Sequence, residues 1–395
     1  MKPLVFSVLP RPPHPTRDGL AIRNYHLLRA LSEVFRVRCF TLLPPHLSAD
    51  PGEYPDGLEV ETIPQADRRL RAVRALAGAA VTGWPYPELL YRSSDLARRV
   101  RESAEKESPA WTIAHSYHVG PVAIDSGRRA WVDFHNVESE IWSRMAGTAS
   151  SAGRRFFARW QAPRVRSLEA SLLVRTAGAS CVSARDAAAF SALSPQASPL
   201  VVPNGVDLER YALRPAPAPR ERVFFVGDLS WPPNAEGIRW LASEVWPILA
   251  RMRPEATVKI LGRRPPADLL GFAGRRFEFL DENRDTRPLW REAAVAVVPL
   301  LAGGGTRLKI LEAAACGVPV VSTRVGAEGL ELEPEREILL RDSAEGFAEG
   351  LAGLLADSNR RADVARRART RVEAGYDWKR IGSRFAEELR SRSVR

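Results

Sequence analysis

Short apolar runs alternate along the chain with longer segments in which apolar residues recur at helical spacing. Runs rich in β-branched and aromatic residues predict buried strands at 3–9, 37–43, 111–115, 130–134, 178–183 and 200–203, and again at 222–227, 257–262, 277–280, 295–299, 318–323 and 337–340. Amphipathic stretches between them, such as 20–34 and 235–252, predict helices. This alternation is typical of parallel sheets covered by helices on both faces.

The alternation breaks at 208–221, where three prolines among polar residues predict a linker. We therefore predict an α/β fold with two doubly wound, Rossmann-like parallel-sheet domains. Residues 1–205 form the first domain, 206–221 the linker, 222–375 the second domain and 376–395 a final segment. Ligands of such sheets bind beyond the carboxyl ends of the strands, so we expect two facing sheets to enclose an interdomain cleft.

Composition and charge narrow the class of protein. The 395 residues carry a formal net charge of +11, which suits phosphorylated ligands or an anionic membrane surface, or simply reflects arginine-rich composition. No aromatic–basic module or zinc spacing supports a nucleic-acid partner. The three cysteines are isolated, no apolar run is long enough to span a membrane, and no signal peptide is recognised, so we expect a cytoplasmic protein without a metal site.

Two basic stretches stand out from the general charge. Residues 68–74 are rich in arginine and precede a run of small apolar residues, and 138–175 is long, helical and basic. Both are candidates for peripheral docking on the inner face of the cell membrane. A solvated helix face explains them equally simply.

The segment 303–309, with the sequence GGGTRLK, carries the strongest chemical signal. It follows the predicted strand 295–299 and opens a helix. Glycines let backbone N–H groups approach a ligand, and Thr306 is suited to cap the helix, whose N-terminus favours an anion. Arg307 and Lys309 add positive charge, so the segment is suited to cradle a diphosphate. A glycine-rich turn with solvated bases is the alternative.

Glu312 lies further along the same predicted helix, too far from its start to act as a cap partner. A carboxylate at this place suits the acceptance of hydrogen bonds from sugar or ribose hydroxyls, as acidic residues do in dinucleotide folds. An ion pair with a nearby arginine is the structural alternative.

Six motifs, in this order along the chain, resemble the retaining GT-B glycosyltransferases of family four, in particular a bacterial branch found in exopolysaccharide and PEP-CTERM-type gene clusters. They are PRPPHPTRDGLAIRNYHLLRAL (10–31), VDFHNVESEIW (132–142), VPNGVD (202–207), FVGDLSWPPN (225–234), GGGTRLKILEAAACGVPVVST (303–323) and GAEGL (326–330). The resemblance implies a GT-B fold, a nucleoside-diphosphate-sugar donor and retention of anomeric configuration. It also implies that no metal cofactor is needed, and that the segment 376–395 is a helix crossing back to the first domain.

Carried over to this chain, the resemblance makes Glu312 the second glutamate of the family's E-x7-E motif, which holds the ribose hydroxyls of the donor. The first glutamate of that motif falls on Gly304, which is a departure from the family pattern. Backbone amides of Gly304, Gly305 and Thr306 are then the candidates for contact with the donor sugar.

A second departure follows strand 222–227. Relatives have an arginine and a lysine there for the diphosphate, and this chain has Asp228 and Pro233. Arg307 and Lys309 are the expected replacements. The donor side is completed by three further residues: Gly19, Gly227 and Arg263.

His135 ends a predicted strand in the motif DFHN, and relatives have a histidine near this place beside the donor sugar. A neutral imidazole there accepts a hydroxyl proton or binds a reacting sugar, so His135 is the candidate catalytic histidine, although an isolated histidine is more often structural. Asn136 and Glu138 are expected to orient it. His118 and Asn136 are the acceptor-side candidates.

The expected function is transfer of a sugar to a glycan or lipid-linked acceptor in surface or exopolysaccharide synthesis. Two other functions stay open: a GT-B sugar-nucleotide epimerase, which needs no acceptor, and a catalytically silent sugar-nucleotide-binding protein.

Overall fold

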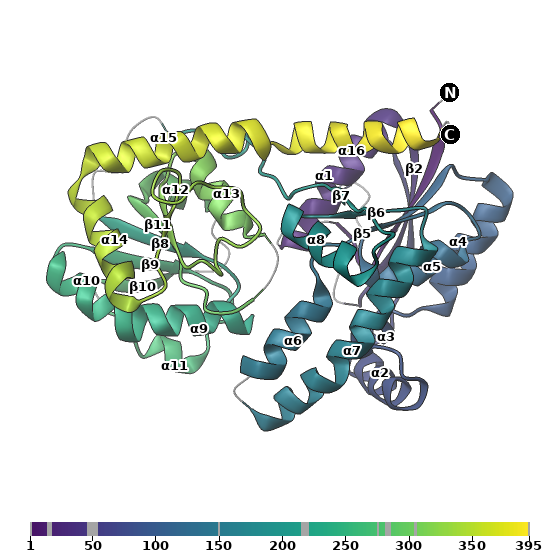
Figure 1. Ribbon diagram of the computed structural model, residues 1–395, viewed down its shortest axis with the longest axis horizontal. Coiled ribbons are helices and arrows are strands. Elements are labelled where there is room, and N and C mark those ends of the chain that lie inside the picture. The colour runs from purple at the N-terminus through teal and green to yellow at the C-terminus, as the bar shows by residue number, and fades with distance from the viewer. Residues whose placement is uncertain are drawn as a thin grey trace. The chain divides into compact units, whose positions relative to one another are not determined.

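The computed structural model describes residues 2–13, 18–45, 54–148, 151–214, 221–274, 276–280, 286–303 and 306–393. The chain forms two units. Unit 1 comprises Met1–Pro203 together with Lys379–Arg395, and unit 2 comprises Asn204–Trp378. Figure 1 labels many of the elements of both.

The sheet of unit 1 is parallel throughout and has the strand order β3-β2-β1-β4-β5-β6-β7. In chain order the strands are β1 Leu4–Leu9, β2 Arg36–Leu43, β3 Leu58–Pro64, β4 Trp111–Ala114, β5 Ala130–Asp133, β6 Gly178–Cys181 and β7 Leu200–Val201. Its first six strands follow the order 3-2-1-4-5-6 of dinucleotide-binding folds. The order reverses between β1 and β4, and ligands of such folds bind at that point, beyond the carboxyl ends of the strands.

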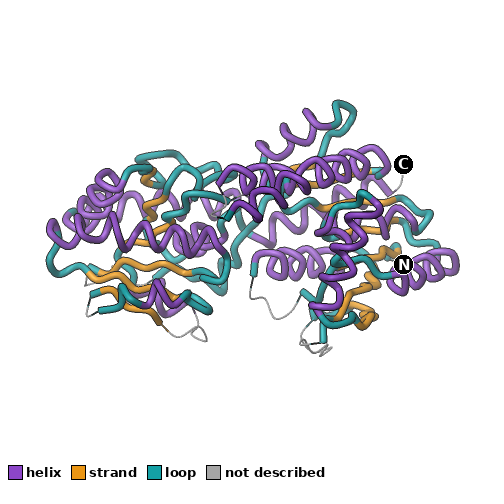
Figure 2. Tube along the Cα trace, turned by 90° about the horizontal axis from the view of Figure 1, so that it is seen from below, coloured by secondary structure: helices purple, strands orange, loops and turns teal. Residues whose placement is uncertain are grey.

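Helices cover the strands of this sheet (Figure 2). Their bounds are α1 Gly19–Val34, α2 Arg68–Thr82, α3 Tyr86–Leu89, α4 Ser94–Glu107, the 3-10 turn η2 Tyr117–Val119, α5 Gly120–Asp125, α6 Glu138–Thr148, α7 Ala152–Arg175, α8 Ala184–Leu193 and α16 Trp378–Ser393.

The last helix, α16, packs closely into unit 1. A Cβ atom at Gly382 would lie 2.6 Å from Cβ of Ala30, so the glycine lets α16 approach α1. The indole N–H of Trp111 donates to the backbone oxygen of Leu389 at 3.1 Å. Helix α16 therefore supplies part of the core of unit 1 from the far end of the chain.

The sheet of unit 2 repeats the same plan, with the order β10-β9-β8-β11-β12-β13 and parallel pairing throughout. The strands are β8 Arg222–Val226, β9 Thr257–Leu261, β10 Phe277–Leu280, β11 Val295–Val298, β12 Val320–Ser322 and β13 Leu339–Leu340. Counted within the unit, this is again 3-2-1-4-5-6, and the order reverses between β8 and β11.

Both faces of the second sheet are covered, as Figure 1 shows. The helical segments are α9 Pro232–Trp240, the π turn η3 Leu241–Val245, α10 Trp246–Met252, α11 Ala267–Leu270, α12 Thr286–Glu292, α13 Leu308–Ala315, α14 Ala344–Ala356 and α15 Ser358–Gly375. One core cluster joins the sheet to α9, α10 and α14, another joins it to α12 and α13, and α15 packs on α13.

The structure differs from the sequence predictions in three places. The predicted helix 235–252 contains a wide turn at Leu241–Val245, just before Pro247, which has no N–H to donate into a regular helix. The predicted helical stretch 138–175 is two helices, α6 and α7. Strand β3 was not predicted because it is a sheet edge with mostly half-exposed residues and lacks an apolar run.

Candidate functional site

The carboxyl ends of β8 and β11 bring two loops together at the point where the strand order of unit 2 reverses. The first loop runs from Gly227 to Trp231 and leads into α9, and the second runs from Pro299 to Arg307 and leads into α13. Gly304 and Gly305, both predicted to contact the donor, lie outside the described residues.

Lys309 reaches from α13 to the first of these loops. Its Nζ donates to Oδ1 of Asn234 at 3.1 Å and lies 4.0 Å from the centroid of the Phe225 ring. A Cβ atom at Gly227 would be only 2.7 Å from the same Nζ. Only glycine at position 227 therefore leaves room for the ammonium group in this position.

The surroundings of Lys309 disfavour its charged form. Burial and, to a smaller extent, the guanidinium of Arg307 lower the pKa of Lys309, Glu312 partly offsets them, and the resulting pKa is about 7. An anion bound beside Nζ would supply the missing negative charge, so the lysine is poised to take up a proton when an anion binds.

Arg307 is the second cation at this place and is 7% exposed. Its guanidinium carbon lies 5.3 Å from the centroid of the Trp231 ring, which holds the side chain by a cation–π contact. Gly303 has φ +129°, and a Cβ atom there would lie 2.6 Å from Nη2 of Arg307. A glycine is thus required on the second loop as well.

The predicted capping role of Thr306 is wrong. Helix α13 begins at Leu308, and its cap position is occupied by Arg307, whose side chain makes no capping hydrogen bond. The hydroxyl of Thr306 is buried and has no hydrogen-bond partner among the residues that the structure describes. The loop stays extended one residue further than the sequence pattern indicates, so Arg307 and not Thr306 lies at the start of the helix.

Glu312 lies one turn beyond Lys309 on α13, next to Tyr211 and Trp290. Burial raises the pKa of Glu312, whereas the neighbouring Tyr211 hydroxyl and Trp290 indole and the charge of Lys309 lower it. The Tyr211 hydroxyl also lies 3.3 Å from Oγ1 of Thr286. The carboxylate therefore sits in a polar niche made by side chains from three separate elements.

Asp228, on the loop after β8, forms ion pairs with two further basic residues, Arg263 and Arg264. Its Oδ2 lies 2.9 Å from Nη2 of Arg263 and 3.3 Å from Nη2 of Arg264, and its Oδ1 accepts from Ser230 N at 2.9 Å. Burial alone would raise the pKa of Asp228, but the hydrogen bonds of Ser230 and the two guanidinium groups lower it. Arg263 is thus held at the carboxyl end of β9 beside the first loop.

In unit 1, Gly19 opens helix α1 after β1, and Asp18 caps that helix by accepting from Ala21 N at 3.1 Å. Asp18 is also paired with Arg11. Gly19 therefore lies beyond the carboxyl end of β1, beside the reversal point of the sheet of unit 1.

His135 follows β5 at the same edge of that sheet. Its Nε2 lies 3.3 Å from Oδ2 of Asp133. Asn136 instead donates to Oε1 of Glu138 at 3.0 Å. The prediction that Asn136 and Glu138 orient His135 is therefore wrong, and the group in contact with the ring is Asp133.

His118 lies in η2, after β4, and is held in place by its neighbours. Its Nδ1 shares a hydrogen bond of 2.7 Å with Ser116 Oγ, and the ring packs against Tyr91 and Tyr117. Burial, together with a smaller effect of His135, lowers the pKa of His118 to about 3, so the imidazole is neutral at physiological pH.

Several residues of these sites were assigned no role from the sequence. Tyr211 lies in the stretch predicted to be linker. Phe225, Trp231 and Asn234 lie in the motif 225–234, but the motif does not reveal which side chains they contact. Their contacts with Lys309, Arg307 and Glu312 arise only when the loops after β8 and β11 meet.

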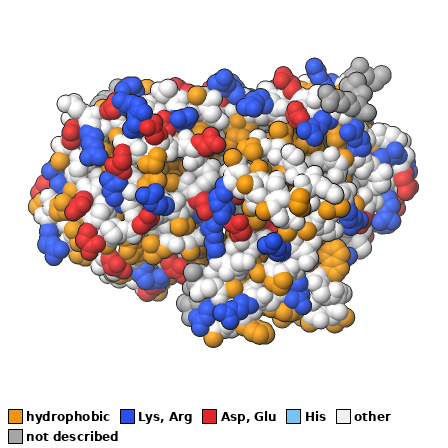
Figure 3. Space-filling model, in the orientation of Figure 1, with side chains coloured by type: hydrophobic (Ala, Val, Ile, Leu, Met, Phe, Trp, Pro, Cys, Tyr) orange, Lys and Arg blue, Asp and Glu red, His pale blue; other side chains and the backbone are white. Residues whose placement is uncertain are grey.

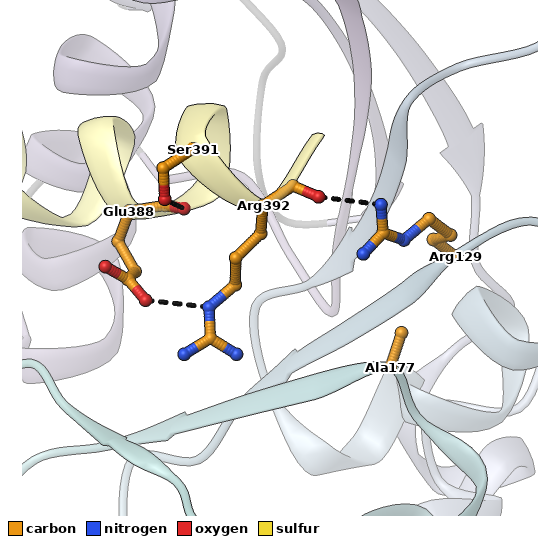
Figure 4. A pocket seen from close by; sticks show the side chains of 5 residues that line it. All are labelled: Arg129, Ala177, Glu388, Ser391 and Arg392. Atoms are coloured by element: carbon orange, nitrogen blue, oxygen red, sulfur yellow. Dashed lines mark hydrogen bonds and ion pairs between the residues drawn. The ribbon is translucent and has the colours of Figure 1, made fainter. Parts of the chain in front are cut away.

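One further pocket, of about 430 Å³, lies at the opposite edge of the sheet of unit 1 (Figure 4). Arg129 and Ala177 precede β5 and β6, and Arg392 of α16 is paired with Glu388. This pocket is at the amino ends of the strands and shares no residue with the sites above. Across the described residues, no group of three or more His, Cys, Asp or Glu is arranged to hold a metal ion.

Comparison with known proteins bears on both units. Residues 220–357 match the family model of glycosyl transferases group 1. The phosphatidyl-myo-inositol mannosyltransferase of Mycolicibacterium smegmatis is 30% identical in an alignment of 199 residues that covers 47% of this chain and 50% of that protein. This chain spans about half the length of the curated relatives it matches.

Solved structures resemble the chain over nearly its whole length. Sucrose-phosphate synthase from Thermosynechococcus elongatus has a TM-score of 0.74 at 18% identity, with 99% of both chains covered. HepE from Anabaena, in complex with UDP and glucose, has a TM-score of 0.68 at 15% identity, with 99% of this chain and 100% of that chain covered. The predicted GT-B fold class, with two α/β parallel-sheet domains, is confirmed by this likeness and by the two sheets.

Proposed function

We propose that this protein, whose residues 220–357 match the glycosyl transferases group 1 model, is a retaining glycosyltransferase. It would move a sugar from a nucleoside-diphosphate donor to a glycan or lipid-linked acceptor in surface or exopolysaccharide synthesis. The HepE structures contain UDP with glucose and UDP-glucose, which supports a nucleotide-sugar donor. The curated mannosyltransferase supports a sugar transferase of this group.

The observation that carries the proposal is the placement of two cations at the reversal point of unit 2. Nζ of Lys309 lies against Gly227, and Arg307 is held over Trp231 on the adjoining loop. They would replace the basic residues that the family resemblance leads us to expect where this chain has Asp228 and Pro233. A diphosphate bound here would meet positive charge from α13 instead of from the loop after β8.

The chemistry follows from where charge develops. In the transfer, the bond from the anomeric carbon to the diphosphate oxygen breaks, and the acceptor oxygen forms the new bond on the same face. The acceptor hydroxyl proton goes to the departing diphosphate oxygen. Negative charge grows on that leaving group in the transition state. Arg307 and Lys309 would stabilise this charge and so lower the barrier to the transfer. Neither a protein nucleophile nor a metal ion is required by this scheme.

The other donor contacts are assigned by position. Glu312 would accept hydrogen bonds from the ribose hydroxyls, and Arg263 with Gly227 would border the nucleotide. Gly19, Gly304, Gly305 and Thr306 would offer backbone amides to the phosphates and the donor sugar, because no carboxylate stands where relatives have the first glutamate. His135 would contact the reacting sugar, with His118 and Asn136 on the acceptor side.

The glycine at position 304 favours a second candidate function, a sugar-nucleotide-binding protein without turnover, because a family carboxylate for the donor sugar is missing. An epimerase would use the same diphosphate site and release its product without an acceptor. Acceptor-dependent product formation separates both from a transferase.

We also propose that the protein is cytoplasmic and docks on the inner face of the cell membrane through α2. This helix buries only Ala75 and Ala79, while Val73 and Val81 are 67% and 86% exposed. Arg68, Arg69 and Arg74 are exposed beside the apolar residues. Apolar side chains flanked by arginines fit the boundary of an anionic bilayer.

The tip of the α6–α7 pair has the same character, with Phe156 74% exposed beside Arg154. At the lower end of unit 1 in Figure 3, where α2, α6 and α7 lie in Figure 1, basic and apolar side chains mix with hardly any acidic ones. No helix among those described is both long and apolar enough to cross a membrane.

Thermal stabilisation by nucleoside diphosphates and their sugars tests the function. A ligand at one hundred times its dissociation constant should add about 2.7 kcal/mol to the free energy of unfolding. We expect the double variant Arg307→Ala/Lys309→Ala to lose this response. Arg251→Ala/Arg384→Ala removes the same charge from exposed positions and should keep it. If no nucleotide stabilises the protein, the donor site is wrong; if one does but no acceptor yields product, the silent binder replaces the transferase.

A further inference from the structure

A buried ion pair joins α1 to β5 in unit 1. Nε and Nη2 of Arg23 donate to Oδ2 and Oδ1 of Asp133, each at 2.7 Å, and the two side chains are 1% and 0% exposed. Nη1 of Arg23 donates to the backbone oxygen of Pro203 at 3.2 Å. This two-point geometry fixes both the position and the rotation of the carboxylate.

Ser180 provides a further hydrogen bond to the carboxylate of Asp133. Ser180 Oγ donates to Oδ1 at 2.7 Å and itself accepts from the indole of Trp131 at 3.0 Å. Although burial alone would raise the pKa of Asp133, Arg23 and then His135 lower it far below its ordinary value. Asp133 is therefore ionised at every physiological pH and has only acceptor atoms to offer.

The ring of His135 meets this carboxylate with one nitrogen. Nε2 is buried, lies 3.3 Å from Oδ2 of Asp133 and has no hydrogen-bond partner of good geometry among the described residues. The side chain as a whole is 13% exposed. In a neutral imidazole one nitrogen carries the proton and the other accepts.

We propose that Asp133, held in place by Arg23, fixes His135 as the tautomer with the proton on Nε2, so that Nδ1 is the atom that accepts a hydrogen bond from a substrate hydroxyl. The tautomer with the proton on Nδ1 would set the lone pair of Nε2 against an ionised, buried carboxylate. That arrangement is repulsive in a low-dielectric environment. Asp133 and Arg23 are thus positioning residues that act through His135.

Two other histidines lie close enough to influence this ring. His115 shares a hydrogen bond of 3.1 Å with Ser7 Oγ, and burial lowers its pKa to about 4. The pKa of His118 is lowered to about 3 by burial, as described above. Both are neutral near pH 7, so the ionised groups acting on His135 from these elements are Asp133 and Arg23.

Only the substrate contact in this inference rests on the proposed function; the tautomer itself does not. The first test is the ring-nitrogen NMR spectrum of the full chain labelled with ¹⁵N-histidine, at pH 8 and without substrate. His135→Gln identifies the resonances of His135 by their loss. We expect a protonated Nε2 and an unprotonated Nδ1. A protonated Nδ1, or an equal mixture of tautomers, overturns the inference whether or not the protein is a transferase.

The second test is Asp133→Asn, checked for folding by circular dichroism. In the folded variant we expect the Nδ1–H form to become populated and, if the wild type shows turnover, kcat to fall about tenfold or more with little change in KM. An unchanged tautomer in the folded variant shows that Asp133 does not set it. If the variant does not fold, the wild-type spectrum still decides. A wild type with the expected tautomer but no turnover refutes the transferase and leaves the tautomer assignment standing.

Discussion

Nζ of Lys309 lies 3.1 Å from Oδ1 of Asn234 and fills the space that a side chain at position 227 would need. Asn234 in turn donates from Nδ2 to the backbone oxygen of Asp228 at 2.8 Å. The loop after β8 thus holds the lysine of α13 in a fixed place.

This contact predicts the effect of a single methyl group. Gly227→Ala would place Cβ 2.7 Å from Nζ of Lys309 and should displace the ammonium group. We expect nucleoside-diphosphate binding, measured by calorimetry, to weaken by about 1.5–3 kcal/mol, the usual contribution of a hydrogen bond to a charged group. Gly353→Ala on α14 meets its neighbours at an ordinary 3.6 Å and should bind as the wild type does. Equal binding by both variants would remove Lys309 from the phosphate site.

The lowered pKa of Lys309 predicts proton uptake on binding. In the free protein, the side chain of Lys309 is neutral in about half of the molecules near pH 7. A bound diphosphate favours the charged form and raises this pKa, so affinity should fall as pH rises above 7. Calorimetry at pH 8 in two buffers of different ionisation enthalpy measures the protons taken up. Lys309→Met should abolish the buffer dependence, and uptake that persists in that variant would point to another group.

Glu312 should distinguish nucleosides from bare phosphates. Hydrogen bonds to a charged group contribute about 1.5–3 kcal/mol, so Glu312→Gln should weaken a nucleoside diphosphate by about ten- to a hundredfold. Inorganic diphosphate, which has no ribose, should bind the variant and the wild type alike. A parallel loss for both ligands would mean that Glu312 acts by supporting Lys309 instead of by contacting the sugar.

Breaking the buried pair of unit 1 should be costly. Arg23→Met leaves Asp133 buried without its partner, and we expect a loss of about 3–5 kcal/mol in the free energy of unfolding, measured by denaturant titration. Arg23→Met/Asp133→Leu should lose less than the single variant because no uncompensated charge remains. A double variant that is less stable than the single one contradicts this account of the pair.

The same pair predicts a dependence of stability on acid. The folded-state pKa of Asp133 is lowered, so its stabilising contribution is present above the ordinary aspartate value of about 3.9 and is lost as pH falls below it. Denaturant titrations between pH 7 and pH 3 should show the loss in the wild type and a smaller one in Arg23→Met/Asp133→Leu.

Membrane docking through α2 predicts that the protein binds anionic vesicles at low salt through the exposed apolar residues of this helix. Val73→Ser/Leu76→Ser should reduce sedimentation with anionic vesicles at low salt, because both residues are exposed apolar contacts on α2. Val174→Ser, at an equally exposed apolar position on α7, is the matched control. Failure of the wild type to sediment with these vesicles would remove the docking proposal.

The sequence predicted the features that repeat locally. Apolar runs located most strands because buried parallel strands are apolar throughout, and the glycine-rich segment located Arg307 and Lys309 because a helix start after a strand has a recognisable pattern. Helix boundaries were less accurate: Thr306 does not cap α13, and Pro247 follows a wide turn.

Contacts between distant segments were beyond the reach of the pattern. Asn234 meets Lys309 across 75 residues, and Arg23 meets Asp133 across 110. The spacing of these four residues along the sequence does not indicate which of them are in contact. Such pairs are fixed by the strand order, which brings β8 beside β11 and sets α1 next to β5, and strand order is not encoded in any one stretch of sequence.

The return of α16 to unit 1 has a consequence for biosynthesis. A ribosome finishes every residue of unit 2 before it makes Phe385 and Leu389, which are buried in unit 1. Until then α16 does not cover the nascent sheet of unit 1, and the indole N–H of Trp111 lacks its acceptor, the backbone oxygen of Leu389. The unit that begins first is therefore completed last, and a chaperone that shields the bare surface during translation would act on unit 1.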